Sequence, residues 1–378
     1  MKRKKTEGMT YAGTGVNYND MDPFKIAAQK AAVETAGNIR FGYSEVTVSR
    51  GESVYLIETP DSYLAHVEEG LGTKNLVADA MYQLCQIVDQ MPNPAKFYEA
   101  IAIDGVAMIV NDMVTLGAMP LSLAMHLAVG NSDWFHDEAR YQGLISGWKK
   151  GCDLAGCAWG GGETPTLRDI VIPGTFVLSG SAMGAIKPKK NIINKGPQPD
   201  DAIIIVRSSG IHANGLSLCR DIAAELPDGY QTILPSGQTY GEALLTPTSI
   251  YVPLIEETFN PHIKINYTAN ITGHGWRKLM RFPGNLTYVI EKVPKPQEIF
   301  SFIQKVGSIT NVEAYGNFNM GAGFALFVPQ DEAQYMVDLA NVLGFEAFDA
   351  GYVQASPDRK VIIEPKKLIF TGDTLQIR

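Results

Sequence analysis

The sequence predicts an α+β protein built from two layered α/β-type domains. Its 378 residues exceed what one hydrophobic core usually holds, because single cores stop growing at roughly 250–300 residues. Strand-like apolar runs alternate loosely with helix-like segments in both halves of the chain. A stretch rich in Pro, Lys, Asn and Gly, residues 187–201, is the best candidate for a linker between the halves. We therefore expect an N-terminal arm and helix over 1–40, a first domain over 41–186 and a second over 187–378.

In the first half, a helix is expected to begin near Pro23 and to stop at Gly37, because proline suits a first helical turn and glycine ends helices. Three further helices and three strands follow from apolar periodicity and from Gly and Pro breakers. The helices are expected over residues 76–91, 100–116 and 134–152, and the strands over 53–57, 121–129 and 176–186.

The second half begins with the apolar run 202–206, which is typical of a central strand. Further strands are expected over residues 286–290, 324–328 and 360–364, and helices over 216–226 and 248–258. The pattern leaves the order of the strands open.

Composition excludes several classes of function. The net charge is −8 and the pI about 5.4, so the chain has no basic field that would hold nucleic acid, and the basic run 2–5 is interpreted as a solvated tail. No stretch reaches the roughly 20 apolar residues that a membrane span needs, and no apolar signal-peptide segment follows the basic start, so we expect a cytoplasmic protein. The four cysteines lack zinc or disulfide spacing and are expected to be buried free thiols.

The segment 69–74, Glu-Gly-Leu-Gly-Thr-Lys, has the composition of a phosphate-binding turn. Glycines allow backbone N–H groups to approach phosphate oxygens, and a lysine adds positive charge. The spacing of a Walker loop is absent, and an ordinary turn is an equally good interpretation.

Asp104, Asn111 and Asp112 interrupt the apolar helix predicted over 100–116. Asn111 and Asp112 follow Asp104 by seven and eight residues, so all three share one helical face. Carboxylates that converge in a pocket suit Mg²⁺, whereas buried hydrogen bonds to neighbouring loops are the structural alternative.

Four more segments are polar and rich in glycine. Residues 160–164, Gly-Gly-Gly-Glu-Thr, are expected to form a loop or sharp turn that carries an acid beside exposed amides. Residues 208–215 end a strand and open a helix, which favours an anion site, although His212 there is also readily explained as a capping histidine. The segments 272–275 and 317–323 are interpreted as tight loops against a ligand or the other domain, or as turns alone.

Taken in order, six segments resemble the aminoimidazole ribonucleotide synthetases (phosphoribosylformylglycinamidine cyclo-ligases). They are EGLGTK at 69–74, IAIDGVAMIVNDMVTLGAMP at 101–120, GGET at 161–164, SSGIHANGLSLCR at 208–220, LLTPTSIYV at 244–252 and FNMGAG at 318–323. The similarity runs from about residue 15 to about residue 364. It implies a homodimer whose N-terminal sheets join in a shared barrel, with ATP and Mg²⁺ bound. The implied reaction closes the ring of formylglycinamidine ribonucleotide and releases aminoimidazole ribonucleotide, ADP and phosphate in de novo purine biosynthesis.

The resemblance also implies roles for individual residues but names no catalytic base. The implied nucleotide-binding residues are Glu69, Gly70, Gly72, Thr73, Lys74, Asp104, Asn111, Gly161 and Gly162. The implied metal ligands are Glu69, Asp104, Asp112 and Glu163, and the implied substrate contacts are Thr164, Ser209, His212 and Asn214.

The chain departs from the family pattern at several positions. Glu69 and Met125 replace aspartates, GGETAEMPG continues as GGETPTLRD, and the TGGGxxEN loop reads TGHGWRKL, with His274 for glycine and Leu279 for asparagine. Two alternatives therefore stay open: a divergent ATP-dependent paralogue similar to thiamine-monophosphate kinase, and a non-catalytic dimeric nucleotide-binding module. Selenophosphate synthetase and the hydrogenase-maturation dehydratase are disfavoured, because the cysteines expected of them are missing from the first loop and the last residues.

Overall fold

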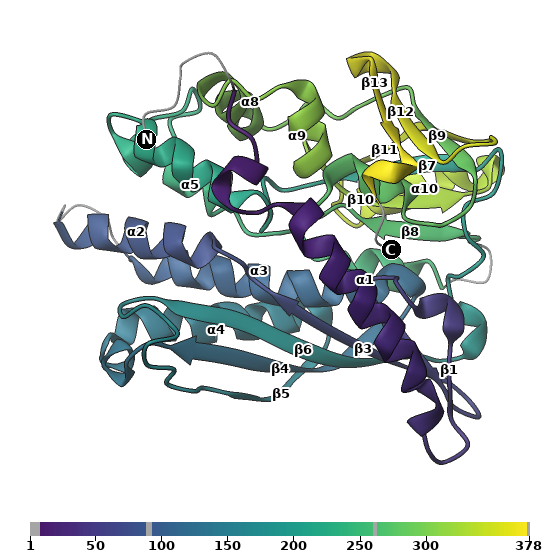
Figure 1. The fold of residues 1–378 in the computed structure, drawn as a ribbon, viewed down its shortest axis with the longest axis horizontal. Coiled ribbons are helices and arrows are strands. Elements are labelled where there is room, and N and C mark those ends of the chain that lie inside the picture. Colours follow the sequence, from purple (N-terminus) through teal and green to yellow (C-terminus); the bar gives the residue numbers. More distant parts are fainter. Residues whose placement is uncertain (1–7, 88–92, 260–262, 376–378) are drawn as a thin grey trace.

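The computed structural model describes residues 8–87, 93–259 and 263–375. Within these residues the strands form two sheets, and helix α3 (Ala95–Met113) lies between the first sheet and the second domain (Figure 1). The predicted two-domain α+β architecture is confirmed. None of the described helices has the length and apolar character that crossing a membrane requires.

The first sheet has the strand order β1-β2-β3-β6-β4-β5 in the described chain, and β4 and β5 are its parallel pair. Its strands are β1 (Ser44–Glu45), β2 (Tyr55–Glu58), β3 (Tyr63–Gly70), β4 (Met119–Val129), β5 (Ala158–Glu163) and β6 (Phe176–Ile186). Three helices cover its inner face: α2 (Lys74–Ile87), α3 and α4 (Glu138–Ala155). Helix α1 (Tyr18–Glu34) runs from the second domain towards the β1 end of this sheet (Figure 1).

The second sheet has the order β13-β12-β9-β11-β7-β10-β8 among the described residues. Its strands are β7 (Ala202–Arg207), β8 (Tyr267–Asn270), β9 (Leu286–Ile290), β10 (Ala322–Val328), β11 (Ala347–Ala355), β12 (Lys360–Ile363) and β13 (Leu368–Thr371). Its helices are α5 (Leu216–Glu225), α6 (Tyr240–Leu244), α7 (Val252–Glu257), α8 (Glu298–Val306), α9 (Asn311–Asn317) and α10 (Ala333–Val342). Strand β7 is flanked by β11 and β10, so the predicted central strand is confirmed.

Two predictions about the first half need correction. Helix α1 begins at Tyr18 rather than near Pro23, because Asn17 caps it by accepting a hydrogen bond from Asn19 N at 3.1 Å, and Pro23 lies inside the helix. The glycine-rich segment 160–164 is largely strand β5 instead of a loop. Its glycines permit close contact with β4, since a Cβ on Gly162 would stand 2.1 Å from the backbone oxygen of Met125.

Other predicted elements differ mainly in extent. The helix predicted over 248–258 is the shorter α7, because residues 248–251 bond to α3 instead of continuing the helix. The helix predicted over 134–152 begins at Glu138, after a 3-10 turn. The predicted end of the helix over 76–91 lies outside the described residues. Strands β1, β3, β8, β11 and β13 and helices α6 and α8 to α10 were not predicted.

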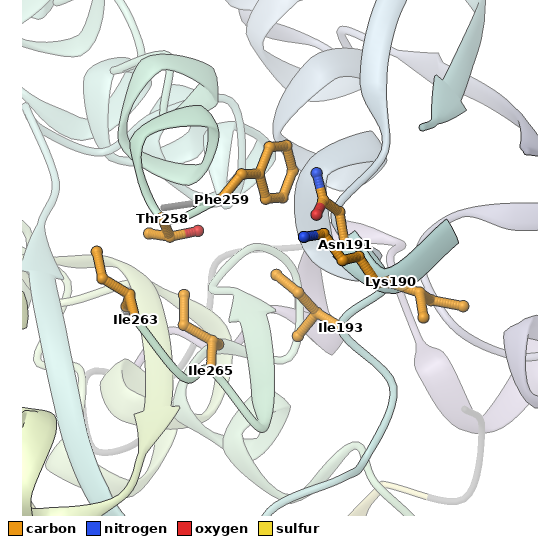
Figure 2. Close-up of a pocket in the computed structure, with 8 residues that line it drawn as sticks. Lys190, Asn191, Ile193, Thr258, Phe259, Ile263 and Ile265 are labelled. Atoms are coloured by element: carbon orange, nitrogen blue, oxygen red, sulfur yellow. The ribbon is translucent and has the colours of Figure 1, made fainter. Parts of the chain in front are cut away.

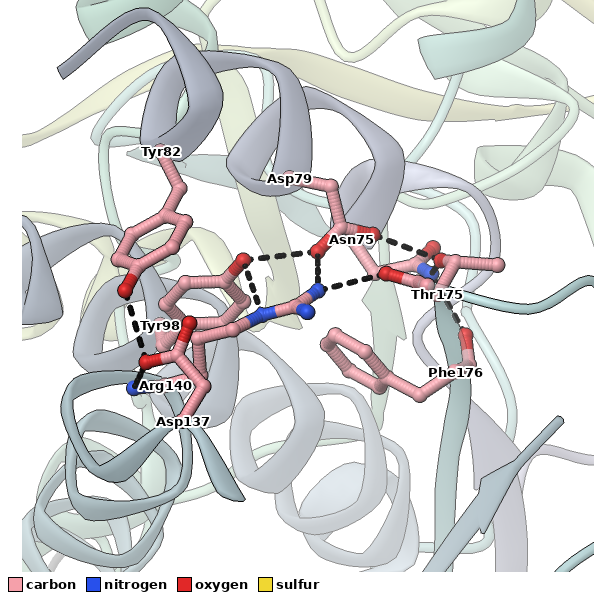
Figure 3. A network of polar contacts seen from close by, with 9 residues as sticks. Asn75, Asp79, Tyr82, Tyr98, Asp137, Arg140, Thr175 and Phe176 are labelled. Carbon is pink, nitrogen blue, oxygen red and sulfur yellow. Dashed lines mark hydrogen bonds and ion pairs between the residues drawn. The ribbon is translucent and has the colours of Figure 1, made fainter. Parts of the chain in front are cut away.

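A buried polar network ties α2, α3 and α4 to the start of β6 (Figure 3). Arg140 of α4 forms an ion pair with Asp79 of α2, with 2.5 Å between Nη2 and Oδ1. Tyr98 of α3 donates to the same carboxylate at 2.8 Å and accepts from Arg140 Nε at 2.9 Å. Thr175 donates to the other Asp79 oxygen at 2.7 Å. The network holds α2, α3 and α4 together against the first sheet.

Replacing Arg140 by alanine should lower the free energy of unfolding by about 3–5 kcal/mol, because it leaves the Asp79 carboxylate buried without its cation. The matched control is Lys149→Ala on the same helix, whose ion pair with Asp153 is 71% and 63% exposed. That control should cost less than about 1 kcal/mol in urea denaturation. Equal losses in the two variants would contradict the structural role given to Arg140.

Candidate active site

The segment 69–74 forms a tight turn from strand to helix, as the sequence predicted. Strand β3 ends at Gly70 and α2 begins at Lys74. Gly72 has a φ of 69°, a left-handed conformation that glycine adopts without a steric penalty. The turn therefore leads directly from β3 into α2, whose first N–H groups have no acceptor one turn earlier within the helix.

The loop 208–215 faces this turn across the domain boundary. It connects β7 to α5 and so forms a second unit of strand, loop and helix. Thr73 Oγ1 lies 3.4 Å from Ser217 Oγ, and a Cβ on Gly72 would stand 4.0 Å from the backbone oxygen of Ala213. We call residues 69–74 and 208–217 together the junction. Two helix N-termini meet there, and helix N-termini attract anions such as phosphate groups.

Two more of the glycine-rich segments reach the junction. A Cβ on Gly273, in the segment 272–275, would lie 3.5 Å from Asn214 Oδ1. A Cβ on Gly323, in the segment 317–323, would lie 3.0 Å from the His212 ring. Both segments thus pack closely against the loop 208–215 of the same domain, and their predicted contact with a ligand or with the other domain stays a prediction.

Lys74 and Asp104 form a fully buried ion pair, with 2.7 Å between Nζ and Oδ2. Lys74 also donates to the backbone oxygen of Thr246 at 3.0 Å. Thr248 donates to Asp104 through its backbone N–H at 2.8 Å and through its hydroxyl. Burial lowers the pKa of Lys74, and the Asp104 carboxylate opposes that shift. Both residues were expected at the nucleotide site, and the structure uses both to join α3 to the second domain.

Of three other predicted site residues, Asn111 also joins α3 to the second domain, whereas Ser209 and His212 are bonded within the second domain. Asn111 donates to Ser249 O and accepts from Tyr251 N, both at 2.8 Å. Ser209 donates its hydroxyl to Pro247 O at 2.6 Å, and its N–H donates to His212 Nε2 at 3.2 Å. Burial and the Lys74 charge lower the pKa of His212 to about 3, so this imidazole is neutral.

Glu69 and Asp112 are the two predicted metal ligands that the structure brings together. Glu69 ends the inward-facing series of β3, after Ala65 and Val67, and so points towards α3. Burial raises the pKa of Glu69 to about 7, the Asp112 carboxylate adds to that shift, and the Lys278 and Arg281 charges oppose it. Asp112 is buried and Glu69 partly buried. Two neighbouring acids that repel each other fit a hard divalent cation, which binds carboxylates together with water and phosphate oxygens.

Two residues beside this acid pair were missed by the sequence analysis. Asn270, at the end of β8, donates to Asp112 Oδ1 at 2.7 Å. Lys278 lies on the 3-10 helix η8 (Gly275–Met280); burial and Arg281 lower its pKa to about 8, while Asp112 and Glu69 oppose that shift. The one available signal for Lys278 was its position in the TGHGWRKL loop, where the TGGGxxEN pattern has glutamate.

Glu163 and its neighbours lie apart from the acid pair. Glu69 pairs with Gly180 on the next strand, Gly180 with Met125, and Met125 with Gly162. Glu69 and Gly162 are therefore three strand spacings apart, which is about 14 Å. Glu163 pairs with His126 and therefore faces the outer side of the sheet. Gly161, Gly162, Glu163 and Thr164 line a shallow pocket of about 530 Å³ at the sheet edge.

In the residues that the structure describes, no three acidic, histidine or cysteine side chains gather as a metal cluster. The assignment of Glu69, Asp104, Asp112 and Glu163 to Mg²⁺ therefore stays a prediction, and Glu69 with Asp112 is its best-supported part. A separate pocket of about 220 Å³ lies between residues 190–193 and the segment after α7 (Figure 2). Half of its eight lining residues are isoleucines, and no predicted site residue contributes to it.

Comparisons with solved structures support the fold. HypE in a HypE–HypF complex aligns with a TM-score of 0.59 and 16% identity over 85% of this chain and 93% of its own. A ThiL protein complexed with AMPPCP and TMP aligns with a TM-score of 0.56 and 13% identity, covering 84% of this chain and 89% of its own.

Comparisons of sequence identify the family. The profile of the AIR synthase related protein N-terminal domain matches residues 74–186, and that of the C-terminal domain matches residues 198–364. The phosphoribosylformylglycinamidine cyclo-ligase of Methanocaldococcus jannaschii is 33% identical over 91% of this chain and 92% of its own length. The enzyme of the same name from Thermococcus kodakarensis is 34% identical over 93% and 98%. With both domains matched and these relatives aligned over nearly their whole length, the chain belongs to the AIR synthase family.

Proposed function

We propose that the chain is an ATP-dependent cyclo-ligase that converts formylglycinamidine ribonucleotide to aminoimidazole ribonucleotide and releases ADP and phosphate. The observation that carries this proposal is the acid pair formed by the partly buried Glu69 and the buried Asp112, beside two facing helix N-termini. The names of the relatives supply the reaction, and these relatives align over more than nine-tenths of their own length.

The described residues suggest how the phosphates of ATP would be held. The N–H groups at the starts of α2 and α5 would bind phosphate oxygens, since both helices begin at the junction. Glu69 and Asp112 would hold Mg²⁺, which when bound neutralises phosphate charge. Lys278 would add positive charge on the second-domain side. The structures of ThiL with AMPPCP and of HypE with ATP support nucleotide binding by proteins of this fold.

The proposed chemistry needs positioning more than acid–base catalysis. The formyl amide oxygen takes the γ-phosphoryl group of ATP, a nitrogen of the amidine attacks the formyl carbon, and phosphate leaves with the former amide oxygen. The chain's task is to align three reacting groups and exclude water from the activated intermediate. Lys74 and Asp104 would serve this task indirectly, by fixing the junction.

The outer face of the first sheet supports a homodimer. Three apolar side chains on this face, Leu121, Val177 and Met183, are about half exposed, at 50%, 50% and 54%. Leu121 and Met183 lie on the adjacent strands β4 and β6, and exposed apolar side chains that adjoin each other are typical of interfaces. We propose that a second copy covers them by joining its own N-terminal sheet to this one in a shared barrel.

ATP with Mg²⁺ should raise the melting temperature by several degrees, because a ligand at about 100 times its Kd adds about 2.7 kcal/mol. Glu69→Gln and Asp112→Asn should each remove most of the Mg²⁺-dependent part of this rise. The matched control is Glu68→Gln, because Glu68 is exposed on the opposite face of β3. An unchanged rise in both acid-pair variants would remove these residues from the metal site.

The free energy of unfolding should fall as the pH rises from about 4.5 to about 7 in metal-free buffer. The pKa of Glu69 is raised by burial, so the folded chain keeps this proton over that range while the unfolded chain releases it. Above about pH 7 both states are ionised, and the stabilising contribution is lost. Urea denaturation across this range should show a smaller fall for Glu69→Gln than for Glu68→Gln; parallel curves would contradict the assignment.

The decisive experiment is turnover of formylglycinamidine ribonucleotide by the purified protein with ATP and Mg²⁺. ADP and aminoimidazole ribonucleotide should appear in equal amounts, as measured by coupled ADP detection and a colorimetric test for the amine. ATP stabilisation without product would favour the divergent paralogue. Absence of both stabilisation and product would favour the non-catalytic module.

A further inference from the structure

Two cysteines meet where helix α4 ends. Gly156 follows the helix with a φ of 64° and donates its N–H to Asp153 O at 3.3 Å. The N–H of Cys157 donates to Cys152 O at 3.1 Å. These two hydrogen bonds define a Schellman motif, in which the side chains at the positions of Cys152 and Cys157 commonly contact each other. This chain has a thiol at both positions.

The two thiols interact directly. Cys157 Sγ lies 3.8 Å from Cys152 O. A hydrogen bond between the two thiols raises the pKa of Cys152, and burial adds to that shift. The same hydrogen bond lowers the pKa of Cys157, while burial opposes the shift. When the pair loses one proton, Cys157 is therefore the thiolate and Cys152 the S–H donor.

The thiols also differ in access. Cys157 is partly exposed, which corrects the prediction that all four cysteines are buried, whereas Cys152 is 3% exposed. The thiolate is the nucleophilic form of cysteine, and reactive cysteines combine a lowered pKa with partial exposure. Cys219 has neither property, because it is fully buried and burial raises its pKa to about 12. Cys157 thus has the properties of an attacking cysteine, and Cys152 stands beside it as a resolving one.

We propose that Cys152 and Cys157 form a peroxide-sensitive dithiol site that closes to a disulfide. The Cys157 thiolate attacks one oxygen of hydrogen peroxide, forms an S–O bond and breaks the O–O bond, so that hydroxide leaves and Cys157 becomes a sulfenic acid. The Cys152 sulfur then attacks the Cys157 sulfur and forms the S–S bond. The sulfenic oxygen leaves as water with the Cys152 proton. Peroxide is the oxidant, and the two thiols supply both electrons.

The disulfide would join the end of α4 to the start of β5. Strand β5 begins directly after Cys157, is an edge strand of the first sheet and pairs with β4 alone in the described part of the chain. All six of its residues are exposed. A covalent bond at its first end would therefore restrain a strand that the sheet holds from one side. The inference goes beyond the proposed reaction and does not depend on it.

Peptide mapping of the oxidised full-length protein tests the inference. Trypsin cleaves after Lys150 and Arg168 and has no site between them, so both cysteines fall in the peptide 151–168. After treatment of the reduced protein with hydrogen peroxide and then iodoacetamide, this peptide should lack two hydrogen atoms and carry no alkyl group. A thiol reductant should restore both alkylation sites. Cys219, in the peptide 208–220, should react at least about tenfold more slowly, since reactivity follows thiolate fraction and access.

Two variants separate the roles of the cysteines. Cys152→Ser should stop the reaction at the sulfenic acid of Cys157, which dimedone traps, and the control Cys219→Ala should form the disulfide as the wild type does. The wild-type map alone decides the inference if a variant does not fold. Two alkylated thiols in the peptide 151–168 after peroxide overturn it, and so does a sulfinic acid at Cys157 without a disulfide. Oxidation of Cys219 at the same rate also overturns it.

Hydrogen exchange measures the effect on β5. The amides of the peptide 151–168 should exchange more slowly in the oxidised protein than in the reduced one, and the difference should disappear in Cys152→Ser. Equal exchange in the oxidised and reduced wild type would overturn the restraint on β5.

Discussion

The buried carboxylate of Asp104 is the constraint on which the arrangement of the two domains depends. Helix α3 is covered from Ile101 to Met113 by the first sheet on one side and the second domain on the other. A carboxylate there must be paired, because breaking a buried ion pair costs about 3–5 kcal/mol. Lys74 supplies the cation and Thr248 two hydrogen bonds, so three separate segments of the chain meet at one side chain. The domains cannot slide past each other without losing these contacts.

The same contacts set the geometry of the junction. Lys74 is both the partner of Asp104 and the first residue of α2, so the ion pair fixes where that helix begins. The sequence pattern assigns this lysine to phosphate binding, but in the structure it holds the start of α2 in place. The partners of an acidic side chain show whether it serves the structure or is open to a ligand. Asp104 has a cation and two donors, whereas Glu69 has a neighbouring carboxylate and a pKa raised to about 7.

Local sequence was sufficient to predict an element wherever the composition of that segment alone favoured one structure. The apolar run of β7 and the bounds of β6 and β9 followed from composition and breakers, and the turn at 69–74 followed from its glycines. Strand β5 was missed because three glycines resemble a loop unless the approach of β4 is known. The face that Glu163 presents depends on strand register, and the place of Lys278 beside the acid pair depends on contacts with distant segments. Such contacts join segments that are distant in the sequence, and the periodicity of one segment does not reveal them.

The departures from the family pattern fall on different sides of the junction. Met125 lies in the first sheet, on the row that also holds Glu69 and Gly162, whereas His274 and Lys278 flank the second-domain side at η8. A lysine in place of glutamate near Glu69 and Asp112 replaces a third negative charge with a positive one. The acid pair then needs less compensation from a divalent cation. The backbone N–H groups at the starts of α2 and α5 do not depend on these side chains. The nucleotide binding that we propose therefore does not require these side chains, and the departures bear on the proposed recognition of the substrate.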